Sequence, residues 1–128
     1  MIKSYRDLRV WQLGMDLAVE AYRMAAGFPK HEAYGLSAQM QRAAVSVPSN
    51  IAEGHAREHR KEYLYHLSTA QASLAELETH AELASRLDYC PLHHVTAFLE
   101  KADALGKQLR ALRTALKSPR KPGGRNGT

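Results

Sequence analysis

Polar side chains follow a helical spacing within the stretch RAAVSVPSNIAEG, and they are the residues of this chain most able to do chemistry. Four of them lie three or four positions apart: Arg42, Ser46, Asn50 and Glu53. A helix would place such residues on one line. Ser and Asn lower helix propensity without benefit on a solvent face, so they suggest a local need for small hydrogen-bonding groups. Three interpretations stay open: a solvent face, a polar network between helices, or an interface with another subunit or a nucleic acid.

The network interpretation also gives roles to carboxylates. A buried charge must be paired, so Arg42 would pair with a carboxylate such as Glu76 or Glu53. His80 follows Glu76 by four residues. A hydrogen-bonded pair on one helix explains that spacing more simply than a catalytic dyad does.

A second cluster combines basic and aromatic side chains. Arg57, Arg60 and Lys61 lie in the stretch HAREHRKEY, and Tyr63 and Tyr65 follow them closely. Basic residues beside aromatic ones can contact phosphate and stack on bases. The alternative is a solvated corner with both tyrosines in the core, and the residues alone favour it.

The positive charge of the chain is concentrated at its C-terminal tail. The formal net charge is +5, and the last twelve residues, KSPRKPGGRNGT, contain no acidic residue. Their basic residues are Lys117, Arg120, Lys121 and Arg125. Such an arm can bind nucleic acid or acidic partners, or it can be solvated and disordered. We expect a nearly neutral folded domain at 1–116 and a basic, disordered tail at 117–128.

Patterns of known catalytic sites are absent from the sequence. No Glu is followed three positions later by His, as a di-metal bundle site requires, and no HExxH or glycine-rich phosphate loop occurs. His55 and His59 could share a metal ion only if one helix carried both. Cys90 has no partner histidine that the sequence can define. We therefore expect no enzymatic activity, no metal and no cofactor.

Four long segments carry the apolar spacing of amphipathic helices. They are expected at 5–26, from about 30–34 to Gly54, at 59–87 and at 92–116. Pro48 should kink the second helix or distort one of its turns, and Gly54 should break or cap it.

Each predicted helix has one expected core face. The first carries Leu8, Trp11, Met15, Ala18, Tyr22 and Ala25, and the second carries Leu36, Met40, Ala43, Val47 and Ile51. The third carries Leu67, Ala70, Leu74, Leu77, Ala81 and Ala84, and the fourth carries Val95, Phe98, Ala102, Leu105, Leu109, Leu112 and Leu116. Short connections between such helices favour an all-α, antiparallel up-down-up-down four-helix bundle.

The composition is typical of a soluble protein in a reducing compartment. The single cysteine cannot form an internal disulfide. The N-terminal residues have no apolar signal region, and no apolar run is long enough to span a membrane. We expect a cytoplasmic protein without a membrane partner.

Three segments resemble the 23S rRNA intervening-sequence proteins, a family of small bacterial four-helix-bundle proteins. They are YRDLRVWQLGMDLAVEAY at 5–22, FPKHEAYGLSAQMQRAAVSVPSNIAEG at 28–54 and EYLYHLSTAQASLAELETHAELA at 62–84. The long pattern from Phe28 to Gly54 is the most specific of them. One departure concerns His59, where the family usually has serine or threonine three residues before Glu62. Such a residue would complete a capping box, so the third helix is expected to begin less firmly here.

The resemblance implies a four-helix bundle that assembles as a homopentamer, has no catalytic activity and binds RNA or DNA. By position it assigns structural or assembly roles to Arg42, Ser46, Asn50, Glu53, Gly54, Ser73 and Glu76. A cyclic pentamer needs two different faces of each subunit, for which the first and second helices are the candidates. The expected nucleic-acid-binding residues are Arg57, Arg60, Lys61 and the four basic residues of the tail.

Two hypotheses from different classes follow. The first is a pentameric nucleic-acid-binding protein, whose affinity should fall steeply with salt. The second is a protein–protein interaction scaffold with no nucleic-acid role, and it explains a nearly neutral domain equally well.

Overall fold

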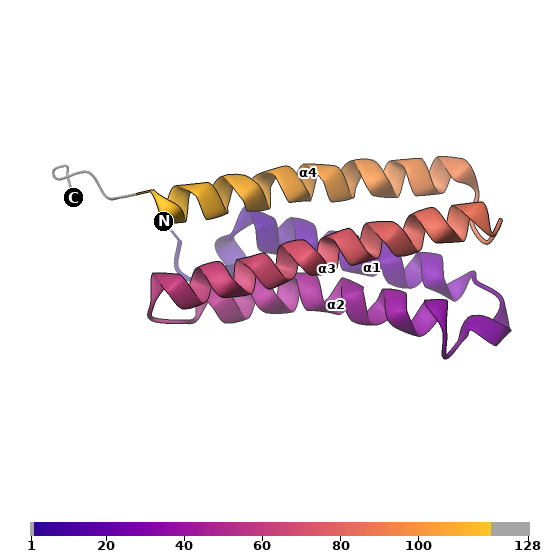
Figure 1. Ribbon diagram of the computed structural model, residues 1–128, viewed down its shortest axis with the longest axis horizontal. Helices are drawn as coiled ribbons and strands as arrows, with labels where there is room; N and C mark the ends of the chain where they lie inside the picture. Colours follow the sequence, from indigo (N-terminus) through magenta and orange to yellow (C-terminus); the bar gives the residue numbers. More distant parts are fainter. Residues whose placement is uncertain (1, 119–128) are drawn as a thin grey trace, which may run out of the picture.

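The predicted helices form a four-helix bundle. The structure is a computed structural model that describes residues 2–118. Its long helices are α1 Arg9–Ala26, α2 Leu36–His55, α3 Arg60–Arg86 and α4 Leu92–Lys117. The 3-10 turns η1 Tyr5–Asp7 and η2 Lys30–Glu32 precede α1 and α2. The helices lie side by side and alternate in direction (Figure 1). Each contacts the next in sequence, and α4 also contacts α1.

The first predicted helix is divided near its start. Ser4 caps η1, because its Oγ accepts a hydrogen bond from the Arg6 backbone N–H at 3.1 Å. Asp7 accepts in return from the Ser4 N–H at 3.1 Å, which completes a capping box. Leu8 then adopts an extended conformation, with φ −75° and ψ 128°. The α-helix therefore begins at Arg9 rather than at residue 5.

The predicted core face of α1 is wrong by one position along most of its length. The buried residues are Val10, Gly14, Leu17, Ala21 and Ala25. Met15 and Tyr22 are 41% and 45% exposed. The helix carries two adjacent apolar stripes, and the one with the smaller residues faces the interior because the helices approach closely there. Within the stripe with the larger residues, Leu8, Trp11 and Ala18 are partly buried against the core, whereas Met15 and Tyr22 lie at the surface.

Pro48 lies inside α2, which continues through it to His55. The proline is buried against α1, where a Cβ added to Gly14 would lie 3.5 Å from the Pro48 Cβ. The missing proline N–H removes one helical hydrogen bond. Pro48 therefore lacks one backbone hydrogen bond of α2 and packs closely on Gly14 of α1.

Gly54 neither breaks nor caps α2, contrary to the prediction. It is a buried helical residue. A Cβ added there would lie 2.8 Å from the His66 Cβ and 3.0 Å from the Tyr63 Cδ1. The glycine is therefore required by the close approach of α3.

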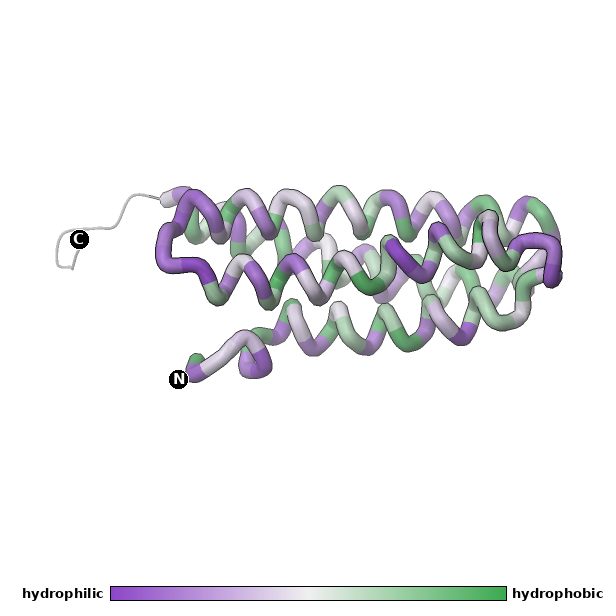
Figure 2. Tube along the Cα trace, turned by 90° about the horizontal axis from the view of Figure 1, so that it is seen from below, coloured by the Kyte–Doolittle hydropathy of each residue, from purple (hydrophilic) through white to green (hydrophobic). Residues whose placement is uncertain are grey.

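The predicted core faces of α2, α3 and α4 are confirmed. Every residue of the α2 and α3 faces is buried, and so are the first five of the α4 face. Leu112 and Leu116 are partly buried where α4 ends. Hydrophobic and hydrophilic residues alternate along each helix (Figure 2). None of the helices in the described residues is both long and apolar enough to cross a membrane.

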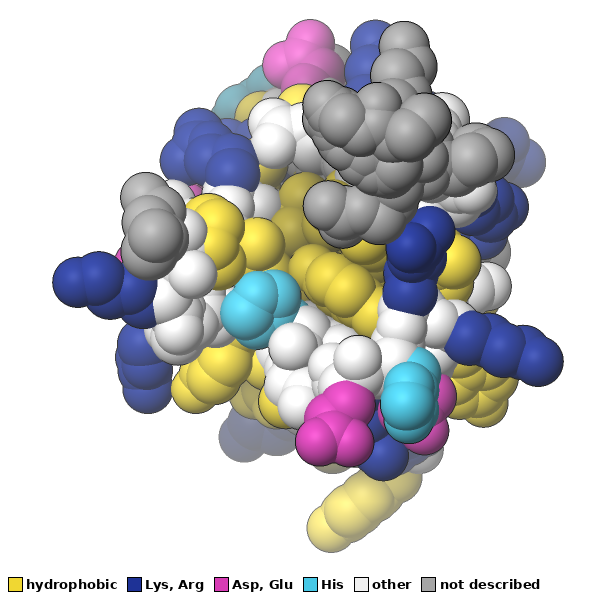
Figure 3. Space-filling view, turned by 90° about the vertical axis from the view of Figure 1, so that its left-hand side faces the viewer, with side chains coloured by type: hydrophobic (Ala, Val, Ile, Leu, Met, Phe, Trp, Pro, Cys, Tyr) yellow, Lys and Arg dark blue, Asp and Glu magenta, His cyan; other side chains and the backbone are white. Residues whose placement is uncertain are grey.

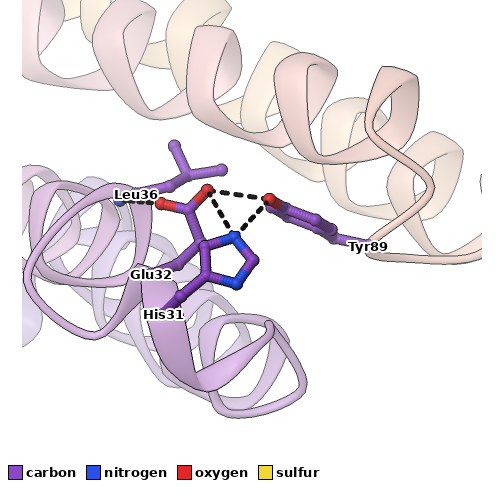
Figure 4. Close-up of polar contacts among 4 residues, drawn as sticks. All are labelled: His31, Glu32, Leu36 and Tyr89. Carbon is purple, nitrogen blue, oxygen red and sulfur yellow. Dashed lines mark hydrogen bonds and ion pairs between the residues drawn. The ribbon is translucent and has the colours of Figure 1, made fainter.

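A carboxylate joins the two loops at one end of the bundle (Figure 4). Glu32 Oε1 accepts a hydrogen bond from the Leu36 backbone N–H at 3.0 Å and so caps the first turn of α2. Its Oε2 accepts from the Tyr89 hydroxyl, in the α3–α4 turn, at 2.8 Å. His31 Nε2 lies 3.8 Å from that Oε2 and 3.3 Å from the hydroxyl. The bonds from Leu36 and Tyr89 lower the pKa of Glu32.

Candidate nucleic-acid interface

Half of the predicted polar set forms a hydrogen-bonded network between α2 and α3. The hydroxyls of Ser46 and Ser73 lie 2.7 Å apart. Asn50 Nδ2 donates to the Ser46 carbonyl at 2.9 Å and lies 3.1 Å from its hydroxyl. Asn50 Oδ1 lies 3.0 Å from His66 Nδ1, which must carry the proton because a carbonyl oxygen only accepts. The small polar residues therefore satisfy one another across the helix contact.

Three predicted members of the network remain outside it. Arg42, Glu53 and Glu76 are exposed. None of them forms a salt bridge within residues 2–118, so Arg42 lacks the predicted carboxylate partner. Arg42 and Glu76 instead line a polar depression of about 300 Å³ beside Ser46 and Ser73. The charged members of the set are therefore surface residues, and two of them, Arg42 and Glu76, lie beside the network.

His80 does not form the predicted hydrogen bond with Glu76. It is 6% exposed, and its Nδ1 has no hydrogen-bond partner. Burial lowers the pKa of His80, and the nearby Glu76 opposes that shift. The lowered pKa favours the neutral imidazole, so His80 is a buried packing residue of α3 rather than a charged partner of Glu76.

The predicted basic cluster lies at the corner between α2 and α3, and all three of its members are exposed. Arg57 lies between the helices, whereas Arg60 and Lys61 begin α3. Arg60 Nη1 donates to the Leu116 carbonyl at 3.2 Å, which joins the start of α3 to the end of α4. Lys117, the last residue of α4, is exposed beside this contact. The fold thus brings Lys117 to the corner cluster.

The two tyrosines after this cluster have different environments. Tyr63 is half-buried and packs against the core, and burial raises its pKa. Its ring meets His55 edge to face, with centroids 5.8 Å apart. Tyr65 is 69% exposed. The expectation that both tyrosines enter the core is therefore wrong for Tyr65.

Sequence reasoning missed cations that the fold adds to this end of the bundle. They are Lys3, Arg6 and Arg9 near the N-terminus and Lys107, Arg110 and Arg113 on α4. The Arg6 guanidinium lies 5.4 Å from the Tyr5 ring centroid and 5.7 Å from that of Trp11. Arg113 differs from the others because it is half-buried and donates to Gln71 Oε1 at 3.3 Å. Counting cations by predicted helix end would have identified the group.

Contacts between helices define one level across the bundle. Gly14 of α1 packs on Pro48 of α2, and Ser46 of α2 bonds to Ser73 of α3. Gln71 of α3 donates to the Gly106 carbonyl of α4 at 3.2 Å. Residues 2–13, 48–72 and 105–118 therefore form one half of the bundle, and 14–47 and 73–104 form the other.

Charge is divided between these two halves. The half that contains both ends of the described chain holds ten Lys and Arg and four Asp and Glu residues. The other half holds five Lys and Arg and nine Asp and Glu residues. We call the first half the cationic end. Figure 3 views the molecule from this side, and Lys and Arg side chains lie around its rim. The folded domain is therefore nearly neutral in total, although one half is positively charged and the other is negatively charged.

The remaining predicted nucleic-acid-binding residues lie beyond the described chain. Arg120, Lys121 and Arg125 belong to residues 119–128, which are outside the structure as described. They follow Ser118, which lies at the cationic end.

An apolar groove of about 530 Å³ runs between α1 and α2. Its lining includes the larger stripe of α1 and three residues of α2: Trp11, Met15, Val19, Tyr22, Val45, Pro48 and Ala52. A second depression, which includes Arg42, Ser46 and Asn50, shares the residues Tyr22, Val45 and Ser49 with this groove. This surface lies on the two helices that were expected to mediate assembly.

The described residues contain no group of three or more His, Cys, Asp or Glu side chains placed to hold a metal ion. Cys90 is half-buried, and burial raises the pKa of its thiol. A raised pKa disfavours the reactive thiolate.

Together, the fold and the surface define a small four-helix-bundle protein with one strongly cationic end and an apolar groove. The chain belongs to the 23S rRNA-intervening sequence protein family, whose profile matches residues 6–111.

One solved structure that the chain resembles is a protein with unknown function from the S23 ribosomal protein family of Bacteroides thetaiotaomicron VPI-5482. The two are 20% identical and superpose with a TM-score of 0.74, over 85% of this chain and 99% of that one. At this identity the likeness shows the fold alone. No curated protein matches the chain significantly.

Proposed function

We propose that this protein is a non-catalytic, homo-oligomeric nucleic-acid-binding protein whose cationic end contacts the phosphate backbone. The division of charge along the bundle carries the proposal. Ten basic residues lie in the half that holds the exposed corner residues Arg57, Arg60 and Lys61. A surface of this kind attracts a polyanion and gains affinity by releasing its counterions.

Two further observations support a nucleic-acid ligand. The family is named for the intervening sequence of 23S rRNA. In the sequence, the basic residues Arg120, Lys121 and Arg125 follow Ser118, the last described residue, which lies at the cationic end. A cytoplasmic location agrees with such a ligand and with a chain that has a single cysteine.

Assembly through the α1–α2 groove is the second part of the proposal. The groove exposes Met15, Val19, Tyr22 and Val45 in the single chain, and large apolar side chains gathered at one exposed site are typical of interaction surfaces. In a cyclic pentamer, a different face of the neighbouring subunit would cover it. The pentamer would then carry five cationic ends. A nucleic acid that contacts several of them would bind with a higher overall affinity, through multivalency.

The nucleic-acid proposal is tested by titrating full-length protein into fluorescein-labelled single-stranded RNA at several salt concentrations. We expect Arg57→Gln and Lys61→Gln to weaken binding at low salt. Each lost phosphate contact should also reduce the slope of log K against log salt by about 0.7. Removal of residues 119–128 should reduce the slope further and leave the oligomeric mass unchanged.

Arg86→Gln is the matched control, because Arg86 is an exposed arginine in the other half of the bundle. It should leave both the affinity and the slope at their wild-type values. Absence of RNA binding by the wild-type protein at low salt would refute the proposal. If Arg86→Gln weakened RNA binding as much as Arg57→Gln does, the cationic end would have no special role in binding.

The apolar groove favours one alternative, a protein–protein interaction scaffold. In that case the groove would hold a helix of another protein. A nuclease-resistant complex that Val45→Glu abolishes, together with no affinity for RNA, would support the scaffold over the nucleic-acid proposal.

A further inference from the structure

Tyr65 places a large aromatic ring on the surface of the cationic end. It is 69% exposed and lies on α3, one helical turn after Lys61. Leu67, two residues later, is completely buried, so Tyr65 is on the side of α3 that points away from the core. A ring this exposed buries only a small part of its surface within the chain, so most of its possible packing is unused. A ligand could supply that packing.

The surroundings of Tyr65 leave its ring accessible. The positions one and two turns later on the same side of α3 are Ser68, Thr69 and Ala72, whose side chains are small. Its ring contacts His66 in a T-shaped arrangement, with centroids 5.6 Å apart. Such a contact uses at most one face of the tyrosine ring, so at least one face remains for another partner.

We propose that Tyr65 stacks on an unpaired nucleobase while Lys61 and Arg57 contact neighbouring phosphates. This inference rests on the proposed function and makes the ligand of the cationic end single-stranded. Bases inside a duplex are already stacked on both faces, whereas an unpaired base can stack on an aromatic side chain. Lys61 lies about 6 Å along the helix axis from Tyr65, so one segment of strand can reach both residues.

The test compares the affinity of full-length variants for a fluorescein-labelled oligouridylate of about 16 nucleotides, long enough to cover a typical single-strand site. Tyr65→Ala should weaken binding by about 5-fold to 100-fold, the usual effect of removing one stacking aromatic. Tyr65→Phe keeps the ring and should bind like wild type. Tyr34→Ala should have no effect, since Tyr34 is 98% exposed but lies at the opposite end.

Two further measurements separate stacking from charge. An oligonucleotide with abasic positions keeps the phosphates, so it should bind wild type more weakly, and Tyr65→Ala should add no further loss. Tyr65→Ala should leave the salt slope unchanged, because stacking releases no counterions, whereas Lys61→Gln should reduce it. A double-stranded RNA of the same length should bind equally to wild type and Tyr65→Ala.

The inference is overturned if Tyr65→Ala binds the oligouridylate as wild type does, or if wild type does not distinguish the abasic strand. In either case a loss of affinity in Arg57→Gln and Lys61→Gln would keep the proposed function intact. If wild type binds none of the three probes at low salt, both the inference and the proposed function fail.

Discussion

Gly54 sets the distance between α2 and α3. The atoms nearest to an added Cβ belong to the root of His66 and to the ring of Tyr63, and neither is the free end of a flexible side chain. Asn50 lies one turn earlier on α2 and reaches His66 at 3.0 Å. The glycine and the polar network are therefore parts of one close helix contact.

Gly54→Ala should destabilise the fold. Alanine favours a helix over glycine by about 1 kcal/mol. Overpacking at a tight contact costs about 1–3 kcal/mol, so we expect a net loss of up to about 2 kcal/mol. Urea unfolding at constant protein concentration measures it. Gly106→Ala is the control, because its added Cβ would meet nothing closer than 3.5 Å, and it should stabilise by up to about 1 kcal/mol. Stabilisation by both substitutions would contradict the argument.

At this scale the sequence predicted residue types better than partners. Ser46 and Asn50 stood out because small polar residues are poor choices for a solvent-facing helix. His66 was missed, although it precedes Ser73 by two helical turns and so shares its side of α3. The pairing itself depends on the register between α2 and α3, which side-chain spacing within one helix does not contain.

At the scale of the elements, spacing predicted the four helices but not every face. α1 has two adjacent apolar stripes, and periodicity alone cannot choose between them. The presence of Gly14 in the smaller stripe was the available signal, because close helix packing needs small residues. The start of α1 also had a signal, since Ser4 and Asp7 have the spacing of a capping box.

The Glu32 carboxylate connects the start of α2 to the α3–α4 turn. Its contribution to the stability of the fold should depend on pH. Its folded-state pKa is lowered below the ordinary value of about 4.3, so the carboxylate stabilises the fold above that pH. The contribution is lost as the pH falls through the folded-state pKa. Glu32→Gln should therefore be less stable than wild type at neutral pH, and the difference should shrink as the pH falls below about 4. Urea unfolding over this pH range measures the difference.

Tyr89→Phe is the control for this connection. It removes the hydrogen bond to Glu32 but keeps the ring that lies 5.6 Å from Phe28. Because the Leu36 N–H still binds the carboxylate, this variant should be destabilised less than Glu32→Gln at neutral pH and should remain pH-dependent. A difference between wild type and Glu32→Gln that stays constant with pH would show that charge plays no part.

At the scale of the whole molecule, the antiparallel fold separates charge between the two ends of the bundle, which the overall composition does not show. Residues 1–116 have nearly equal numbers of acidic and basic side chains. Folding places the starts of α1 and α3 beside the ends of α2 and α4, and these segments are the basic ones. The corner cluster could be predicted from the sequence. The contributions of the N-terminus and α4 emerge only when basic residues are counted by the predicted end of the bundle, because they depend on which segments become neighbours.

The oligomeric state also belongs to the scale of the whole molecule. The larger apolar stripe of α1 lines a groove that is uncovered in the single chain. Val19→Glu and Val45→Glu place a charge in that groove at positions that are already 45% exposed, so each subunit should still fold. We expect both variants to shift the mass measured by light scattering from oligomer to monomer, because an unpaired buried charge is costly at an interface. Leu92→Glu is the control, as Leu92 is 70% exposed outside the groove, and it should preserve the oligomer. A monomeric wild type, or groove variants that keep its oligomeric mass, would show that other copies of the chain do not cover this surface.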